Sequence, residues 1–189
     1  SRLPYLLKLI APAQPLSLQV HPSIAQAEEG YAAEEAAGVP HRDPRRNYKD
    51  RNHKPELVYA LSTFQALAGF RARRRIGEVI EALGTPLTDD LRRVLRSRGV
   101  RGAFEFLLSE PTRPGADAVA EVAVACERRL RAGESPSRRA DSIVVRLAER
   151  YPGDPGVVAS LLLNPVTLRT GEALFLSAGT AHAAEVGVD

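Results

Sequence analysis

The sequence of 189 residues contains no methionine and only one cysteine. Because a chain without methionine does not begin at a natural start codon, we expect a fragment, a processed product or an excised domain. The lone thiol, Cys126, cannot form a disulfide within the chain. Single cysteines are typical of proteins in reducing compartments, so we predict a cytoplasmic protein.

Long apolar runs and a strong charge of one sign are also missing. The apolar runs are far shorter than the roughly 20 residues that a membrane helix needs, and no signal peptide is recognisable, so we expect no membrane partner. The 26 basic and 23 acidic residues leave a formal net charge of only +3. This mild balance argues against nucleic acid as a partner. The hydrophobic content of 44% is enough to bury a core.

Residues 1–70 read mainly as strands and turns. The apolar run 4–10 is typical of a buried strand, and strict alternation of apolar and polar residues predicts another strand over 16–21. Further strands are predicted over 57–61 and 64–70.

Helical signals fill the middle of the chain. Ser23 is a candidate N-cap for a short helix, and the proline-containing stretch 39–55 reads as a loop. Helical periodicity takes over in residues 71–151. One helix there is expected to open at Thr88 and to end at Gly99.

Strand patterning returns near the end of the chain. Asp154 caps a predicted helix that runs to Leu163, and short strands are predicted over 166–168 and 173–176. The order of strands, helices and strands predicts an α+β fold in which a helical insertion interrupts a β domain. The predicted β domain comprises residues 1–70 and 153–189, and the predicted insertion comprises residues 71–152.

Polar side chains that could bind a metal ion come from three separate stretches. Gln19 and His21 share one face of a predicted strand, and Lys54 and Glu56 are likewise two residues apart. His182 follows a hydrophobic strand and a glycine turn. Two imidazoles, one carboxylate and an amide oxygen could hold a divalent cation such as zinc. The simpler alternative is that these polar faces only meet solvent.

A nine-residue motif carries a resemblance to a known family. Residues 48–56, Y-K-D-R-N-H-K-P-E, resemble the Y-x-D-x-N-H-K-P-E signature of type I phosphomannose isomerases at every specified position. Residues 3–8 and 14–22 are similar to the strands that precede this signature in the family. Residues 171–176 and 179–182 are similar to its later metal-binding strand and turn. The resemblance extends over nearly the whole chain and is weakest in residues 71–150.

The resemblance implies a zinc site and a particular fold. Carried over by motif, the zinc ligands fall on Gln19, His21, Glu56 and His182, with one Zn²⁺ per chain. The implied fold is a cupin-type β jelly roll, here partial, with a helical domain inserted into it.

The resemblance also implies an activity. Family members interconvert mannose 6-phosphate and fructose 6-phosphate, moving a proton between C1 and C2 through an enediol. Lys8, His53 and Lys54 match positions that line the active site, and the base cannot be ranked among them. Ser17 and Lys54 are candidates to bind the sugar phosphate. We expect a monomer.

The chain departs from the family pattern near its end. Ala181 stands where a proline is usual before the last zinc histidine, and Ala184 replaces an aromatic residue. Complete family members carry further strands, an active-site aspartate and arginine, and a second cupin-like domain. A non-catalytic metal-binding cupin fragment is therefore one alternative to an isomerase. An iron-dependent cupin oxygenase is a second, against which the glutamine and the signature argue.

Overall fold

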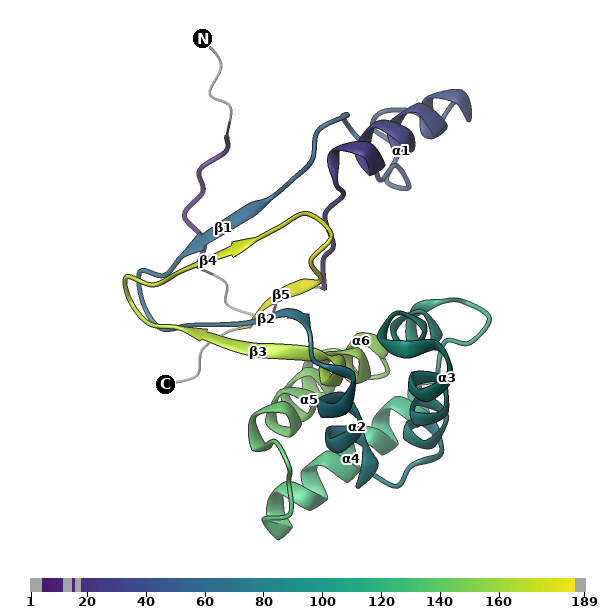
Figure 1. Ribbon diagram of the computed structural model, residues 1–189, viewed down its shortest axis with the longest axis vertical. Coiled ribbons are helices and arrows are strands. Elements are labelled where there is room, and N and C mark those ends of the chain that lie inside the picture. The colour runs from purple at the N-terminus through teal and green to yellow at the C-terminus, as the bar shows by residue number, and fades with distance from the viewer. Residues whose placement is uncertain (1–4, 12–14, 16–17, 186–189) are drawn as a thin grey trace.

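The computed structural model describes residues 5–11, 15 and 18–185. Along this part of the chain, one helix and two strands precede a block of helices, and three further strands follow it (Figure 1). The helices are α1 (Ile24–Ala36), α2 (Arg73–Glu81), α3 (Pro86–Leu108), α4 (Ala116–Ala132), α5 (Arg138–Arg150), α6 (Pro155–Ala159) and a 3₁₀ turn at Ser160–Leu162. The strands are β1 (Glu56–Tyr59), β2 (Phe64–Phe70), β3 (Leu163–Leu168), β4 (Ala173–Leu176) and β5 (His182–Glu185). The predicted mixture of helices and sheets is confirmed.

Two small sheets carry the strands. β1 and β4 form an antiparallel pair, and β3, β2 and β5 form an antiparallel sheet in that order. Helices α2 to α6 gather beside the three-stranded sheet, whereas α1 lies apart from them (Figure 1). The pairing opposes Glu56 to Leu176 and His182 to Ala68. Two candidate metal ligands are the first residues of their strands, since β1 begins at Glu56 and β5 begins at His182.

Capping residues fix where the first long helices begin. Ser23 caps α1 through a capping box with Gln26, as its sequence position predicts. The prediction that a helix opens at Thr88 is wrong, because Thr85 is the N-cap of α3 and Thr88 closes the capping box from the third helical position. Gly99, with φ of 69°, interrupts α3 where an end was predicted, but the helix resumes and continues to Leu108.

Several predicted strands differ from the observed ones. Residues 5–10 are exposed and form no strand, so the prediction of a buried strand over 4–10 is wrong for its described part. Within 16–21 only Gln19 makes a bridge, and residues 16 and 17 lie outside the described residues. An apolar run becomes a strand only where a partner pairs with its backbone, and no described strand pairs with 5–10.

Strand boundaries shift by a few residues elsewhere. The strand predicted over 57–61 begins at Glu56 and ends at Tyr59. β3 begins at Leu163, where the helix from Asp154 was expected to end, because Leu163 pairs with Phe70 of β2. The strands predicted over 64–70 and 173–176 are confirmed.

A hydrophobic core holds the helices together. Helices α2 to α6 bury large aliphatic side chains against one another, each contributing ~1.5–3 kcal/mol relative to exposure. Among the fully buried members are Ile76, Ile80, Leu83, Leu91, Leu107 and Leu161. Cys126 lies in this core, as its helical stripe predicts, and burial together with the nearby Asp141 carboxylate raises the pKa of its thiol to about 12. No helix in the described ranges has the length and apolarity to cross a membrane.

A buried ion pair ties α4 to α5. Arg129 is 5% exposed and Asp141 is fully buried, and the guanidinium donates two hydrogen bonds to the carboxylate. A further hydrogen bond from Arg129 Nη1 reaches the Val79 carbonyl of α2 at 2.8 Å. One arginine therefore joins three helices.

Replacing Arg129 tests this junction. We expect Arg129→Ala to lower the free energy of unfolding by ~3–5 kcal/mol, because the buried Asp141 carboxylate loses the guanidinium that is hydrogen-bonded to it. Urea unfolding followed by circular dichroism measures the loss. Arg131→Ala is the control, since Arg131 is 77% exposed in its pair with Glu127 and should cost less than ~1 kcal/mol. Equal losses in the two variants would contradict the assignment.

Candidate metal centre

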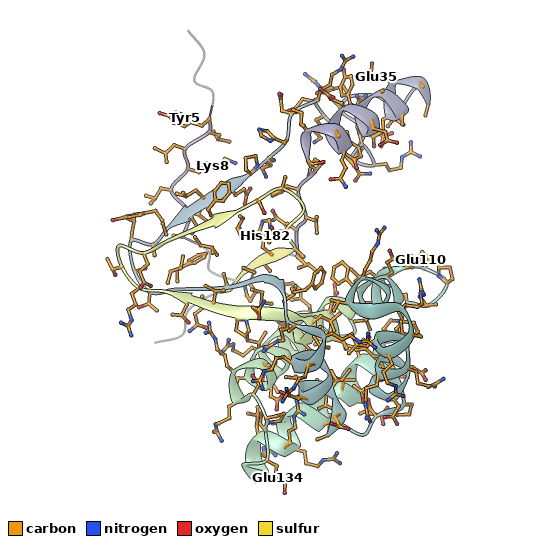
Figure 2. The ribbon with its side chains drawn as sticks, viewed as in Figure 1. Tyr5, Lys8, Glu35, Glu110, Glu134 and His182 are labelled. Atoms are coloured by element: carbon orange, nitrogen blue, oxygen red, sulfur yellow. The ribbon has the colours of Figure 1, made fainter. Side chains whose placement is uncertain are left out.

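Three side chains from distant stretches converge on one point. His21, Glu56 and His182 each offer one ligand atom, and these atoms all lie within 4.8 Å of one another. His21 Nε2 lies 3.0 Å from Glu56 Oε1, and His182 Nε2 lies 3.3 Å from Glu56 Oε2. The two imidazole rings are 5.1 Å apart between centroids. Figure 2 labels His182 at the start of β5.

Backbone hydrogen bonds bring the three segments together. The N–H of Gln19 donates to the carbonyl of His182 at 2.8 Å, and the N–H of His182 donates back at 2.9 Å. The N–H of Gly179, in the turn before β5, donates to the carbonyl of His21 at 2.7 Å. Gly179 has a φ of 84°, a conformation that glycine adopts readily and other residues rarely do. The turn thus holds His21 and His182 side by side.

The hydrogen bond at Nδ1 shows that this ring nitrogen of His182 carries a proton. Nδ1 lies 2.8 Å from the carbonyl oxygen of Thr180, which can only accept, so Nδ1 carries the proton. In the neutral ring Nε2 therefore presents a lone pair. This Nε2 is buried, faces a Glu56 oxygen and has no hydrogen-bond partner among the described residues. Two electron-rich atoms facing each other in a buried place are stabilised by a cation between them.

Lys54 joins the same cluster. Its Nζ lies 3.0 Å from Glu56 Oε1 and 3.2 Å from His21 Nε2. Burial and the Lys54 ammonium lower the pKa of His21. Burial alone would raise the pKa of Glu56, but Lys54, His21 and His182 outweigh it and lower that pKa. At neutral pH the cluster therefore presents a neutral His21 ring and an ionised Glu56 carboxylate, the forms that bind metals.

The donor set fits zinc. Zinc in proteins takes imidazole nitrogen and carboxylate oxygen in a four-coordinate shell, with an open position in catalytic sites. Gln19, the predicted fourth ligand, is half-buried and adjoins the cluster through its backbone pairing with His182. The Nε2 of His182, buried and without a hydrogen-bond partner among the described residues, is the atom that best fits a role as a metal ligand.

The other predicted site residues are placed differently. Lys8 is exposed on the segment that precedes α1, outside any strand, and no described contact joins it to the cluster (Figure 2). His53 is also exposed, although it neighbours Lys54 in the chain. Ser17 lies outside the described residues. Their roles stay predictions, as do those of the metal ligands.

Sequence reasoning did not identify Thr180 as a partner of the centre. Its carbonyl accepts from a histidine two residues later, a contact that depends on the turn and not on the threonine side chain. The Thr180 hydroxyl instead lies 3.0 Å from Ser177 Oγ across the same turn. The only signal in the sequence is the short spacing from Gly179 to His182.

A mixed α/β fold with a cluster of two histidines and one carboxylate that could hold a metal ion is the class that the structure indicates, and comparisons with known proteins narrow it. Residues 1–73 match the family described as phosphomannose isomerase type I, catalytic domain. Mannose-6-phosphate isomerase of Escherichia coli (strain K12) is 37% identical over 198 residues, covering 98% of this chain and 46% of that protein. The rat mannose-6-phosphate isomerase is 28% identical over 195 residues, covering 96% of this chain and 44% of its own length.

Solved structures agree with these relatives. Mannose 6-phosphate isomerase from Salmonella typhimurium, bound to substrate and a zinc atom, superposes with a TM-score of 0.76 at 36% identity, covering 93% of this chain and 44% of that one. A zinc-bound holo form of mannose 6-phosphate isomerase gives the same TM-score and identity. The predicted resemblance to type I mannose-6-phosphate isomerases is confirmed over nearly the whole chain. The chain spans less than half the length of these relatives.

The lowered pKa of His21 predicts how the stability of the metal-free protein depends on pH. Because the folded chain holds this pKa below its ordinary value of 6.5, the unfolded chain binds more protons between the lowered pKa and about 6.5. In EDTA the contribution of His21 to stability is therefore complete above about pH 6.5 and falls as the pH drops below it. Urea unfolding at about pH 7 and about pH 5.5 should show a larger pH-dependent loss for the parent protein than for His21→Gln.

The control for this measurement is His41→Gln. His41 is exposed and lies outside the cluster, with its Nε2 2.8 Å from the Lys49 carbonyl. We expect this variant to keep the parent's pH dependence. An unchanged pH dependence in His21→Gln would show that His21 is not held neutral by the fold.

Proposed function

We propose that this chain is the metal-bearing portion of a zinc-dependent isomerase that interconverts mannose 6-phosphate and fructose 6-phosphate. The convergence of His21, Glu56 and His182 within 4.8 Å carries the proposal. The names of the relatives, isomerases that include zinc- and substrate-bound forms, support it. These relatives also favour an isomerase over the iron-dependent oxygenase alternative.

The proposed zinc shell consists of Gln19, His21, Glu56 and His182, with one ion per chain. The fold proposed around it is a partial cupin jelly roll, made of residues 1–70 and 153–189 and interrupted by a helical insertion, residues 71–152. The antiparallel pairing of β1 with β4 and of β2 with β3 and β5 supports this architecture. The hydrophobic core that α2 to α5 share supports the insertion, although α6, at Pro155–Ala159, joins the same core from beyond residue 152.

Zinc, when bound, would supply Lewis-acid polarisation and orientation of sugar oxygens. Lys54 is the residue of this chain best placed to contact a sugar phosphate, because its ammonium lies beside the Glu56 carboxylate and its side chain is 58% exposed. We propose that it donates hydrogen bonds to substrate oxygens. The proton that moves between C1 and C2 requires a base among Lys8, His53 and Lys54, and Ser17 is proposed to contact the phosphate.

A non-catalytic metal-binding fragment is the second candidate function. The exposed positions of Lys8 and His53, outside the cluster of His21, Glu56 and His182, favour it. An assay of the zinc-loaded chain on mannose 6-phosphate separates the two candidates. Formation of fructose 6-phosphate supports the isomerase, whereas stoichiometric zinc without turnover supports the fragment.

We further propose that the protein works as a cytoplasmic monomer on a small sugar phosphate, without nucleic acid or membrane as a partner. The single buried cysteine is consistent with a reducing compartment. The small net charge gives no electrostatic reason for nucleic-acid binding.

Removing one imidazole tests the zinc shell. We expect His21→Ala to weaken zinc binding by about a hundredfold or more, since even loss of a partner that orients a ligand costs ~10–100-fold. Elemental analysis of dialysed protein measures the zinc content. His41→Ala, in which the lost imidazole lies outside the cluster, should retain zinc. Equal zinc in the two variants would rule out His21 as a ligand.

Removing the ammonium tests the substrate site. We expect Lys54→Ala to retain zinc but to bind mannose 6-phosphate ~10–100-fold more weakly, since a hydrogen bond to a charged group contributes ~1.5–3 kcal/mol. Isothermal titration calorimetry on zinc-loaded protein measures the affinity. Lys49→Ala removes an exposed lysine five positions earlier and should bind as the parent does. Parent-like affinity in Lys54→Ala would remove this residue from the substrate site.

A further inference from the structure

The segment between two proposed metal ligands contains a set of contacts that the proposed chemistry does not use. His21 and Glu56 are separated by 34 residues, 22–55. This connector consists of α1, which begins two residues after Pro22, and of a long loop without regular structure that ends in the signature motif. Figure 1 shows α1 and this loop together, away from the other helices. The shape of the connector therefore depends on contacts within it.

Arg46 is the centre of these contacts. Its side chain is only 1% exposed, although the loop around it is mostly exposed. Nη1 donates to the carbonyl of Val39 at 2.7 Å, and Nε donates to the carbonyl of Tyr48 at 2.9 Å. Nη2 forms an ion pair with Glu35 of α1 at 2.6 Å. One buried guanidinium therefore joins both ends of the loop segment 39–48 to the helix.

Glu34, one residue earlier on α1, binds the loop through its backbone. Its two carboxylate oxygens accept from the N–H groups of Asn47 at 2.9 Å and Tyr48 at 2.8 Å. The hydrogen bond from Asn47 is the main cause that lowers the pKa of Glu34, although its burial acts in the opposite direction. The start of the signature motif is thereby fixed to the helix.

Close packing completes the junction. The ring of Tyr48 lies against Gly30 so tightly that a Cβ at Gly30 would come within 2.4 Å of it. The Tyr31 ring lies under the guanidinium groups of Arg46 and Arg51, at 4.9 and 5.1 Å. We call Gly30, Glu34, Glu35, Arg46 and Tyr48 the α1 clamp.

We propose that the α1 clamp positions His21 and Glu56 to hold one metal ion, an inference that rests on the proposed zinc site. With the clamp closed, the free parts of the connector shrink from 34 residues to nine, 22–23 and 49–55. The probability that the ends of a loop meet falls with about the 3/2 power of its length, so the clamp favours convergence of the two ligands by about sevenfold. Its members are positioning residues that touch neither metal nor substrate.

Two adjacent arginines offer a matched test. Arg46→Ala should lower zinc affinity about sevenfold, measured by competition with a chromophoric chelator. Arg45→Ala should change it less than twofold, because Arg45 is 86% exposed and pairs only with Asp43 in its own turn. Equal zinc affinity in the two variants overturns the proposal.

A second variant separates positioning from loss of structure. Gly30→Ala places a methyl group against the Tyr48 ring and so disturbs the α1 clamp. The same substitution does not weaken the helix itself, because alanine is a better helix former than glycine. We expect lower zinc affinity with helix content retained by circular dichroism. Parent-like zinc affinity in Gly30→Ala would contradict the proposed role of the α1 clamp. This conclusion holds even if Arg46→Ala does not fold.

A readout without zinc distinguishes failure of the clamp from failure of the proposed function. In EDTA, hydrogen–deuterium exchange at the β1 amides, residues 56–59, should be several-fold faster in Arg46→Ala than in Arg45→Ala. If the parent chain binds no zinc, the proposed function fails, while faster exchange still supports the clamp as the element that orders Glu56. Equal exchange in both variants overturns the clamp whatever the zinc result.

Discussion

The Glu56 carboxylate is the point on which the centre depends. It lies between two imidazole nitrogens and a lysine ammonium, at 3.0 to 3.3 Å. A carboxylate in a partly buried place needs compensating positive charge, and here Lys54 supplies part of it. His182 Nε2 faces the second oxygen of the same carboxylate, while Nδ1 of that ring bonds to the Thr180 carbonyl. Glu56 thus lies within 3.3 Å of both imidazoles, and the three side chains together could hold a cation.

The backbone explains why three distant stretches meet. The Gln19–His182 bridge and the bond from Gly179 to His21 are short-range contacts between the ends of long connections. The helices between β2 and β3 bury most of their apolar side chains in a core of their own, and α5 also packs Ile143 against Leu67 of β2 and Leu163 of β3. The connector between His21 and Glu56 is stabilised separately, by the hydrogen bonds that Arg46 and Glu34 make with the backbone of Tyr48. Both long connections are therefore restrained by contacts that lie outside the cluster.

Much of this arrangement was predictable from the sequence. The grouping of His21, Glu56 and His182 followed from ligand-type residues in three separate stretches and from the resemblance to the family, and β2 and β4 fall where strands were predicted. The start of α3 was not predictable, because Thr85 and Thr88 are both good capping residues and only the geometry shows which is the N-cap. The run at 5–10 is apolar enough for a strand, but composition does not say whether a partner strand lies beside it. The hydrogen bond that places a proton on His182 Nδ1 depends on the turn at Thr180, and no pattern of residue types predicts the geometry of that turn.

The signature motif can be divided by physical role. Tyr48 at its start packs on Gly30 and is held by Glu34 and Arg46, whereas Lys54 and Glu56 at its end form the cluster. Between them, Asp50 Oδ1 accepts from the N–H of Asn52 at 2.8 Å, which closes a local turn. A motif that joined anchor and ligand through a flexible link would lose the alignment that its anchor provides. The turn at Asp50 therefore restricts a few residues of the link 49–55 that the α1 clamp itself does not hold.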